Sequence, residues 1–288
     1  MKASELVLAP NGSLYHIHLD SSTLANKVLL VGDPGRVEMF KGIFEHIEFE
    51  SHNRELHALT GTYHGTRLTA LSTGMGCDNI DIVMTELDAA LRVENGEWRA
   101  ESDRHLQLVR IGTSGSLQAD IDCGSHVASR YAIGLDGLMN YYKEWRVESG
   151  EWRAMEEAFL KHMDLSPRLA RPYCVAGSEQ LFDKIAYDMH RGITTTAPGF
   201  YGPQGRTIRL HPSIENLNEK LASFCWDGTP VTNLEMETSA IYGFSHLLGH
   251  EALTVCLIIA NRPKGTFLND YHPQMRELVG TVVERLIS

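Results

Sequence analysis

Short apolar segments that alternate with helical patterns constrain the fold of this chain most strongly. Lys27–Val31 (KVLLV) has the composition of a short buried strand, and 79–92 places apolar residues at helical spacing. Further strands are predicted over 44–51, 67–72, 106–111, 126–133, 173–176, 192–196 and 253–260, and further helices over 179–188, 235–248 and 274–287. Strand–helix alternation over the whole length predicts an α/β fold around a largely parallel or mixed sheet.

Length and composition favour a single domain inside the cell. The chain has 288 residues, of which 43% are hydrophobic, which is enough for one large domain or for two smaller ones, and it contains no linker or low-complexity run. We therefore expect one domain over 1–288. No run of eighteen apolar residues occurs, and the first residues, MKASELVLAPNG, lack the features of a signal peptide. These patterns predict a soluble, cytoplasmic protein.

Charge and cysteine usage exclude several classes of partner. Lys plus Arg is 26 and Asp plus Glu is 37, and this net charge of −11 argues against nucleic acid. A small anion would have to be bound by a few focused arginines, because the overall field opposes it. The five cysteines are scattered without a C-x-x-C pair, which argues against a disulfide framework or a zinc site. No metal and no cofactor are expected.

Three Gly-rich segments follow predicted strands and could hold an anion. They are Gly32–Arg36 (GDPGR), Ser72–Gly76 (STGMG) and Arg110–Gly115 (RIGTSG), the last expected to form a loop. Glycine allows close backbone approach, and an arginine matches phosphate oxygens. Each segment alone is equally explained as an ordinary turn. Together, two arginines and a Thr-Ser pair favour a free phosphate over a dinucleotide, whose fingerprint is missing.

Two further segments could recognise a nucleoside. Gly199–Arg206 (GFYGPQGR) carries an amide and a guanidinium near an aromatic ring, which together match a flat base with two carbonyls and one N–H. Asn233–Glu237 (NLEME) is expected to open a helix, and its carboxylates could accept from sugar hydroxyls. Arg262 follows the apolar strand. A solvated turn, a helix dipole and a surface arginine remain the alternative explanations of these three features.

A near-repeat stands outside these motifs. VENGEWRAESD begins at Val93, and VESGEWRAMEE begins at Val147. Two copies do not make a solenoid. Both are charged and contain glycine, so surface excursions are expected, and no function follows from them.

The motifs in their order resemble the nucleoside phosphorylase family that includes uridine phosphorylases. The resemblance rests on GDPGRV, STGMG, RIGTSG, GFYGPQGR, NLEMETSA and IIANRP, with LYHIHL near the N-terminus, and runs from about residue 14 to the C-terminus. It implies a three-layer α/β/α domain with a central mixed sheet, of the nucleoside phosphorylase type.

The resemblance assigns a role to each of the following residues. Phosphate would be bound by Gly32, Arg36, Arg110 and Thr113, and by Arg54 from the neighbouring subunit, although Asn53 is inserted before that arginine. Ribose would be bound by Glu235, Met236 and Glu237, and by His16 of the neighbouring subunit. Uracil would be bound by Thr113, Ser114, Gly115, Phe200, Gln204 and Arg206, with Arg262 orienting the loop.

The implied reaction is phosphorolysis of uridine to uracil and ribose 1-phosphate, in pyrimidine salvage. Arg206 and Gln204 would stabilise the charge that develops on the leaving uracil, and Arg110 would hold the attacking phosphate. Purine phosphorylases of this fold carry a Ser-Asp pair where this chain has Asn261-Arg262, so a purine substrate is disfavoured. Use of 2′-deoxyuridine or thymidine stays open, as does the physiological direction.

Assembly and rival functions complete the expectations. Because His16 and Arg54 would serve a neighbour, a homodimer is the minimal unit, and a hexamer stays open. A monovalent cation near Glu55 would match a site between subunits in some relatives. The alternatives are a nucleosidase of the same fold that uses water, or a non-catalytic nucleoside-binding or storage protein. A dinucleotide-dependent oxidoreductase fails, because the fingerprint and its acidic ribose partner are missing.

Overall fold

The computed structural model describes residues 2, 4–99, 102–146 and 150–288. The chain forms two compact units. Unit 1 contains the described residues of 1–109, 244–251 and 287, and unit 2 contains those of 110–243, 252–286 and 288. Each unit is described by itself, and one domain over 1–288 stays a prediction. No helix among the described residues is long and apolar enough to cross a membrane.

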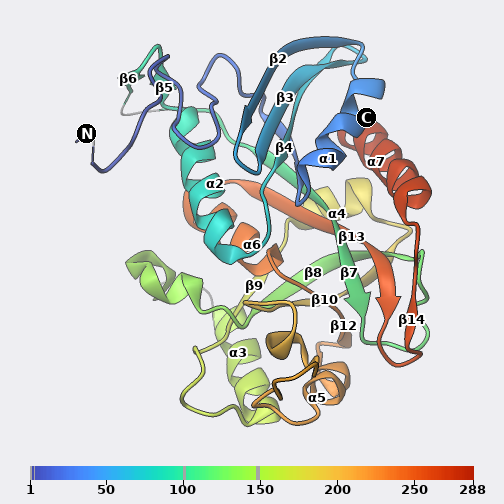
Figure 1. Ribbon diagram of the computed structural model, residues 1–288. Helices are drawn as coiled ribbons and strands as arrows, with labels where there is room; N and C mark the ends of the chain where they lie inside the picture. The colour runs from blue at the N-terminus through green and yellow to red at the C-terminus, as the bar shows by residue number, and fades with distance from the viewer. Residues whose placement is uncertain (1, 3, 100–101, 147–149) are drawn as a thin grey trace. The chain divides into compact units, whose positions relative to one another are not determined.

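Four strands of unit 1 are paired side by side in the order β1-β4-β3-β2 (Figure 1). Its elements are β1 (Lys27–Val31), α1 (Pro34–Val37), the 3-10 helix η1 (Glu38–Gly42), β2 (His46–Asn53), β3 (Leu56–Tyr63), β4 (Thr66–Ser72), α2 (Cys77–Ala90), β5 (Val93–Glu94) and β6 (Glu97–Trp98). β1 pairs with β4 in parallel, whereas β2, β3 and β4 form antiparallel hairpins. β2 carries one extra residue near Glu48, because Ile47 pairs with Gly61 and Phe49 with Thr60.

Unit 2 contains a further run of paired strands (Figure 1). Its elements are most of β7 (Gln107–Ser116), β8 (His126–Gly134), the 3-10 helices η2 (Leu138–Tyr141) and η3 (Lys143–Arg146), α3 (Gly150–Met163), β9 (Tyr173–Ala176), α4 (Glu179–Ile185), β10 (His190–Thr196), η4 (Gly202–Gln204), α5 (Leu217–Ser223), β11 (Cys225–Trp226), β12 (Thr229–Glu235), the first part of α6 (Thr238–Leu248), most of β13 (Glu251–Asn261), β14 (Thr266–Phe267) and most of α7 (His272–Ile287). The order β11-β12-β10-β8-β13 combines parallel pairs (β12–β10 and β10–β8) with antiparallel ones.

Apolar packing in the core of unit 2 explains why α3 forms. α3 presents Met155, Phe159 and Met163 at a spacing of four residues, and all three are fully buried. They join Ile133 and Val231 of the sheet in one apolar cluster. α3 and α5, absent from the sequence-based prediction, thus cover a sheet whose strands read as apolar runs.

Two sequence-based assignments are wrong at the strand ends. Residues 112–116 belong to β7 and not to a loop, because Gly115 and Ser116 pair antiparallel with Leu234 and Asn233 of β12. For the same reason Asn233–Glu235 ends a strand, and the helix starts only at Thr238. Pairing between β7 and β12 therefore determines that both segments are strands. The prediction also missed β3 and β12, whereas β1, β9 and α4 begin at the predicted residues.

Candidate active site

The first Gly-rich segment places an arginine against the glycine before it. Asp33 caps α1 by accepting from the Gly35 N–H at 2.9 Å, so Pro34 and Arg36 occupy a short helical turn. A Cβ at Gly32 would lie 3.4 Å from Arg36 Nη2. The Arg36 side chain is buried. Unit 1 thus brings together Gly32 and Arg36, the pair expected to bind phosphate.

Arg54 lies at the exposed tip of the β2–β3 hairpin, where its φ is +55°. The inserted Asn53 does not merely lengthen the strand. Its Nδ2 donates to the carbonyl oxygens of Tyr15 and His16, each at 3.0 Å. Asn53 therefore attaches the histidine segment to the hairpin that carries Arg54.

Glu86 is a residue of this region that sequence reasoning missed. Its buried carboxylate in α2 accepts from the backbone N–H groups of His16 (3.0 Å) and Ile17 (2.9 Å). It also contacts His16 Nδ1, which fixes the ring and leaves Nε2 as the outward nitrogen. The signal in the sequence was an acidic residue three positions after Val83, on the apolar face of the helix.

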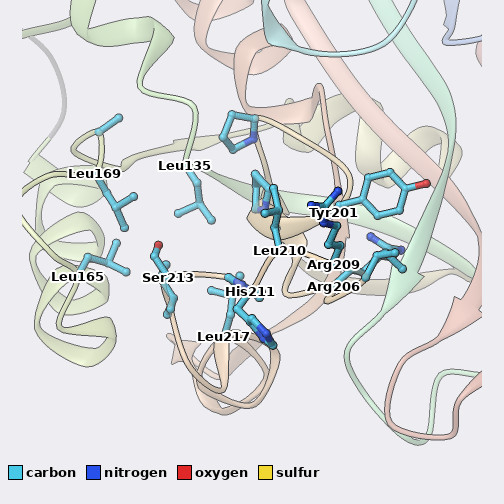
Figure 2. Close-up of a pocket in the computed structure, with 17 residues that line it drawn as sticks. Leu135, Leu165, Leu169, Tyr201, Arg206, Arg209, Leu210, His211, Ser213 and Leu217 are labelled. Atoms are coloured by element: carbon cyan, nitrogen blue, oxygen red, sulfur yellow. The ribbon is translucent and has the colours of Figure 1, made fainter.

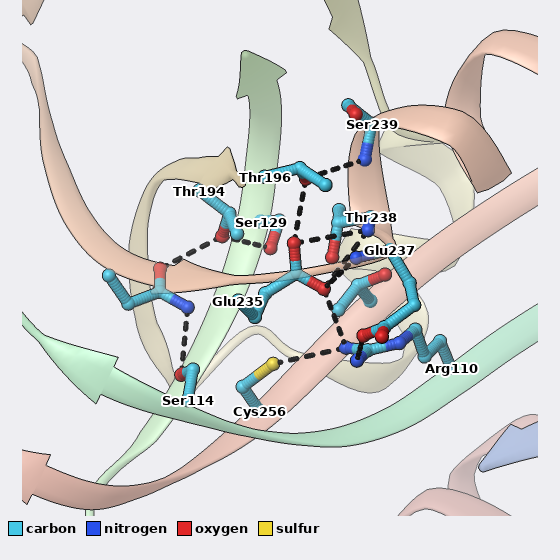
Figure 3. A network of polar contacts seen from close by, with 12 residues as sticks. Arg110, Ser114, Ser129, Thr194, Thr196, Glu235, Glu237, Thr238, Ser239 and Cys256 are labelled. Carbon is cyan, nitrogen blue, oxygen red and sulfur yellow. Dashed lines mark hydrogen bonds and ion pairs between the residues drawn. The ribbon is translucent and has the colours of Figure 1, made fainter. Parts of the chain in front are cut away.

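Arg110 and two carboxylates form the centre of unit 2 (Figure 3). Arg110 Nη1 lies 3.2 Å from Glu235 Oε2, and Nη2 donates to Glu237 Oε2. Nη1 also donates to Cys256 Sγ at 3.5 Å. The guanidinium folds back over Gly112, where any Cβ would clash with Nη1. Glycine at 112 is thus required for this conformation.

Burial and charge act in opposite directions on these groups. Burial by itself lowers the pKa of Arg110, but the charges of Glu235 and Glu237 outweigh it, so the pKa is raised above its ordinary value. Burial raises the pKa of the adjacent Cys256 thiol to about 11. Arg110 is therefore permanently charged, and the thiol is protonated at neutral pH.

Glu235 has a structural role that its neighbour Glu237 does not share. Its carboxylate accepts from the N–H groups of Glu237 (2.9 Å) and Thr238 (3.0 Å), and from Thr196 Oγ1 (2.7 Å). These bonds satisfy backbone donors where α6 starts. Together with Arg110 they engage both oxygens of Glu235, so this side chain holds the start of α6 in place instead of presenting a free acceptor.

A buried chain of polar groups fixes Ser114 (Figure 3). Asn233 Nδ2 donates to Ser114 Oγ at 2.9 Å, and Asn233 Oδ1 accepts from Thr194 Oγ1 at 2.8 Å. Thr194 in turn contacts Ser129. Thr113 and Met236 are half-buried beside these groups in the sequence. The network holds β7, β12, β10 and β8 in register at the strand ends.

The predicted base-recognition residues lie together in the segment around η4. Arg206 Nη1 donates to Gln204 Oε1 at 2.6 Å, and its guanidinium stacks 3.8 Å from the Phe200 ring centroid. Arg262 Nη2 donates to the Gln204 carbonyl oxygen at 2.9 Å. Arg262 also passes Gly115, where a Cβ would lie 3.8 Å from its Cγ. β7 thus carries Arg110 at one position and, at Gly115, passes Arg262, which holds the segment of Gln204 and Arg206.

Arg206 is an arginine with a lowered pKa. Burial is the largest cause, the charge of Arg262 adds to it, and together they lower the pKa of Arg206 to about 10. The side chain remains a cation at neutral pH. It is held beside a neutral amide and an aromatic face, an arrangement suited to negative charge that appears only during a reaction.

A pocket of about 820 Å³ lies behind this segment (Figure 2). Leu165 and Leu169 line one side, and Tyr201, Arg206 and Arg209 line the other. Among the predicted site residues, only Arg206 lines it. Gln204, Glu237 and Arg110 face elsewhere, so this apolar pocket is distinct from the polar groups described above.

The family is decided by a match along nearly the whole chain. The family model described as "Phosphorylase superfamily" matches residues 26–288. The chain belongs to the phosphorylase superfamily. The predicted α/β class with a mixed sheet, of the nucleoside phosphorylase type, is thereby confirmed.

Relatives within the phosphorylase superfamily differ in their substrates. A uridine phosphorylase of Thermococcus kodakarensis is 30% identical over 89% of this chain and 80% of its own length. A guanosine phosphorylase of Halorubrum lacusprofundi is 25% identical over 90% of each chain. The crystal structure of a Trypanosoma brucei nucleoside phosphorylase, whose title states uridine phosphorylase activity, is 30% identical. It aligns with a TM-score of 0.87 over 98% of this chain and 99% of its own.

Membership in the phosphorylase superfamily fixes the reaction class. The protein is a nucleoside phosphorylase, a pentosyltransferase whose small-molecule substrates are a nucleoside and inorganic phosphate.

Proposed function

We propose that this phosphorylase acts on uridine, releasing uracil and ribose 1-phosphate. The observation that carries the proposal is the group of Gln204, Arg206 and Phe200, which Arg262 holds through the Gln204 carbonyl at 2.9 Å. A donor-rich guanidinium and an amide match the two carbonyls and one N–H of uracil. Phe200 supplies an apolar face for a flat ring.

The environment of Asn261 argues against a purine substrate. The buried side chain donates from Nδ2 to the carbonyl oxygens of Gln118 (3.0 Å) and Ile121 (2.9 Å). Its Oδ1 accepts from the Lys264 N–H at 2.9 Å. The amide thus holds the surrounding loops, and neither Asn261 nor the adjacent Arg262 offers an acid for protonation of a purine ring. Guanosine phosphorolysis is the second candidate, because a guanosine phosphorylase is among the relatives.

In the proposed mechanism, charge stabilisation replaces covalent catalysis. As the bond to uracil N1 lengthens, negative charge spreads over the base, and Arg206 with Gln204 stabilises it. Phosphate attacks C1′ and is held by Gly32, Arg36, Arg110 and Thr113. Ribose hydroxyls donate to Glu237, which Arg110 orients through its ion pair. Thr113, Ser114 and Gly115 complete the uracil site, and Met236 packs against the sugar.

A homodimer is the proposed minimal active unit. His16 and Arg54 would reach the neighbour's site, His16 at the ribose and Arg54 at the phosphate. The exposure of Arg54 at a hairpin tip and the attachment of its hairpin to the His16 segment through Asn53 support this arrangement. A monovalent cation near Glu55 remains a prediction, as does a cytoplasmic location.

The test is base release from uridine, thymidine, 2′-deoxyuridine, inosine and guanosine, each with and without phosphate. Uracil release that requires phosphate and yields ribose 1-phosphate is the expected result. Faster release from guanosine than from uridine would favour the second candidate. Release without phosphate would identify a nucleosidase, and no release from any nucleoside would leave a binding or storage role.

A further inference from the structure

A cluster of two histidines and two glutamates lies on the β2–β3 hairpin of unit 1, outside the groups used above. Glu50 and His52 are two residues apart in β2, so their side chains share one face of the strand. His57 of β3 is the direct antiparallel partner of His52, which brings it to the same face. Glu38 approaches from η1. Each of these four residues offers one ligand atom within 4.8 Å of the others.

The contacts converge on one carboxylate oxygen. Nε2 of His52 and Nε2 of His57 lie 3.1 Å and 3.0 Å from Glu50 Oε1. The two imidazole rings stack with centroids 3.7 Å apart. Ligand atoms around a tetrahedral zinc ion lie about 3.3 Å from one another, given metal–nitrogen distances of about 2.0 Å. Each nitrogen thus lies at close to this spacing from the oxygen, and all the ligand atoms of the cluster lie within 4.8 Å of one another.

The second nitrogen of His57 fixes which atom can bind a metal. Nδ1 faces the Pro34 carbonyl oxygen at 3.4 Å and Glu38 Oε1 at 3.7 Å. Both of its ring nitrogens therefore face acceptors, whereas a neutral imidazole has only one N–H. Donation from Nδ1 leaves a lone pair on Nε2, directed at a carboxylate. Metal-bound histidines commonly have this arrangement, in which the other N–H is held by a carboxylate or carbonyl.

We propose that Glu50, His52 and His57 form a binding site for a divalent transition-metal ion, with zinc as the probe. Glu38 orients His57 and supplies the fourth ligand, an oxygen. The site forms because β2 and β3 pair and bring His52 beside His57. The spacing of cysteines and histidines along the sequence therefore did not indicate it. The buried His57 gives the site a rigid side, and the exposed Glu50 and His52 leave it open to entry.

Lys41 is the competitor for this position. Its Nζ lies 2.7 Å from Glu50 Oε1 and 3.0 Å from Glu38 Oε2. The ammonium therefore occupies the place of a cation between the two carboxylates. Because Lys41 lies at the surface, its side chain can turn into water when a metal binds. Removal of this charge should then strengthen metal binding.

The test is calorimetric titration of the full-length protein with zinc chloride in phosphate-free buffer. We expect one zinc ion per chain for the wild type. His52→Gln and Glu50→Gln should each weaken binding at least about tenfold, and Lys41→Gln should tighten it. His64→Gln is the matched control, since His64 is an exposed histidine that faces Glu45 at 3.4 Å on the neighbouring strand end. His57 is left intact, because it is buried.

The spectrum of bound cobalt(II) gives a second readout that does not depend on enzyme activity. The wild type should show the visible bands of a tetrahedral nitrogen- and oxygen-ligated ion, and His52→Gln should lose them. Three results would overturn the proposal: no saturable zinc binding by the wild type, binding that survives both His52→Gln and Glu50→Gln, or no change in Lys41→Gln.

Discussion

Arg110 and Arg206 are two arginines of unit 2 in opposite electrostatic settings. Arg110 is buried between Glu235 and Glu237, and its pKa is raised above the ordinary value because their charges outweigh burial. Arg206 contacts a neutral amide and an aromatic ring, and burial together with Arg262 lowers its pKa to about 10.

The difference separates a cation that is already paired with carboxylates from one that has no acidic partner among the contacts described here. The charge of Arg110 is already balanced in the free protein, so its removal leaves two buried carboxylates without their partner. The charge of Arg206 has no acidic partner in the contacts described here, and we infer that it is reserved for a leaving base. Three predictions test this contrast.

The largest effect is expected on turnover when the available cation is removed. Arg206→Ala should lower kcat for uridine phosphorolysis about 10³-fold, because it deletes a donor directed at charge in the transition state. The KM for phosphate should change little. Arg209→Ala, which removes an exposed arginine three residues away, is the matched control and should retain wild-type kcat. An equal loss in kcat and in phosphate affinity would contradict this role for Arg206.

The second effect is on stability. Arg110→Gln should lower the free energy of unfolding by about 3 kcal/mol, since breaking a buried ion pair leaves uncompensated charge. Arg206→Gln should change it by less than about 1 kcal/mol. Urea denaturation in phosphate-free buffer measures both values. Similar losses in the two variants would remove the distinction between these arginines.

The smallest effect is a difference in chemical reactivity. At pH 9, a guanidinium with a pKa of about 10 is neutral in about one molecule in ten, against about one in three thousand for an ordinary arginine. Butanedione, which attacks the neutral form, should therefore modify Arg206 faster than the exposed Arg209. Arg262→Gln should slow the reaction at Arg206, because its charge helps to lower that pKa. Mass spectrometry of peptides gives the rates, and equal rates at Arg206 and Arg209 would contradict the shift.

The near-repeat shows where sequence patterns stop predicting structure. In the first copy, Asn95 and Gly96 both have positive φ and form the turn of the β5–β6 hairpin. The second copy begins at 147–149, outside the described residues, and continues as α3, in which Trp152 packs against the apolar core. The expected surface excursion is thus wrong for α3, because apolar residues that follow at helical spacing outweigh a local match of the sequence.

The site was predictable where the chemistry is local. The Gln204–Arg206 pair, with Arg262 beside it, could be identified from one motif and the strand after it. Glu86 could not, because its role depends on a segment 70 residues away that donates backbone N–H groups to it. The proposed metal site was missed for a related reason, since only the β2–β3 register places His52 against His57. Both features depend on contacts between residues that the fold brings together, and the spacing of residues along the chain does not predict such contacts.

Asn53 has a consequence for two segments of the chain. An inserted residue usually adds slack to a hairpin, but here its amide joins the hairpin to the carbonyls of Tyr15 and His16. Deleting it would remove both hydrogen bonds at once and free the histidine segment from the hairpin. A change at Asn53 therefore alters two segments that lie 37 or 38 residues apart in the chain.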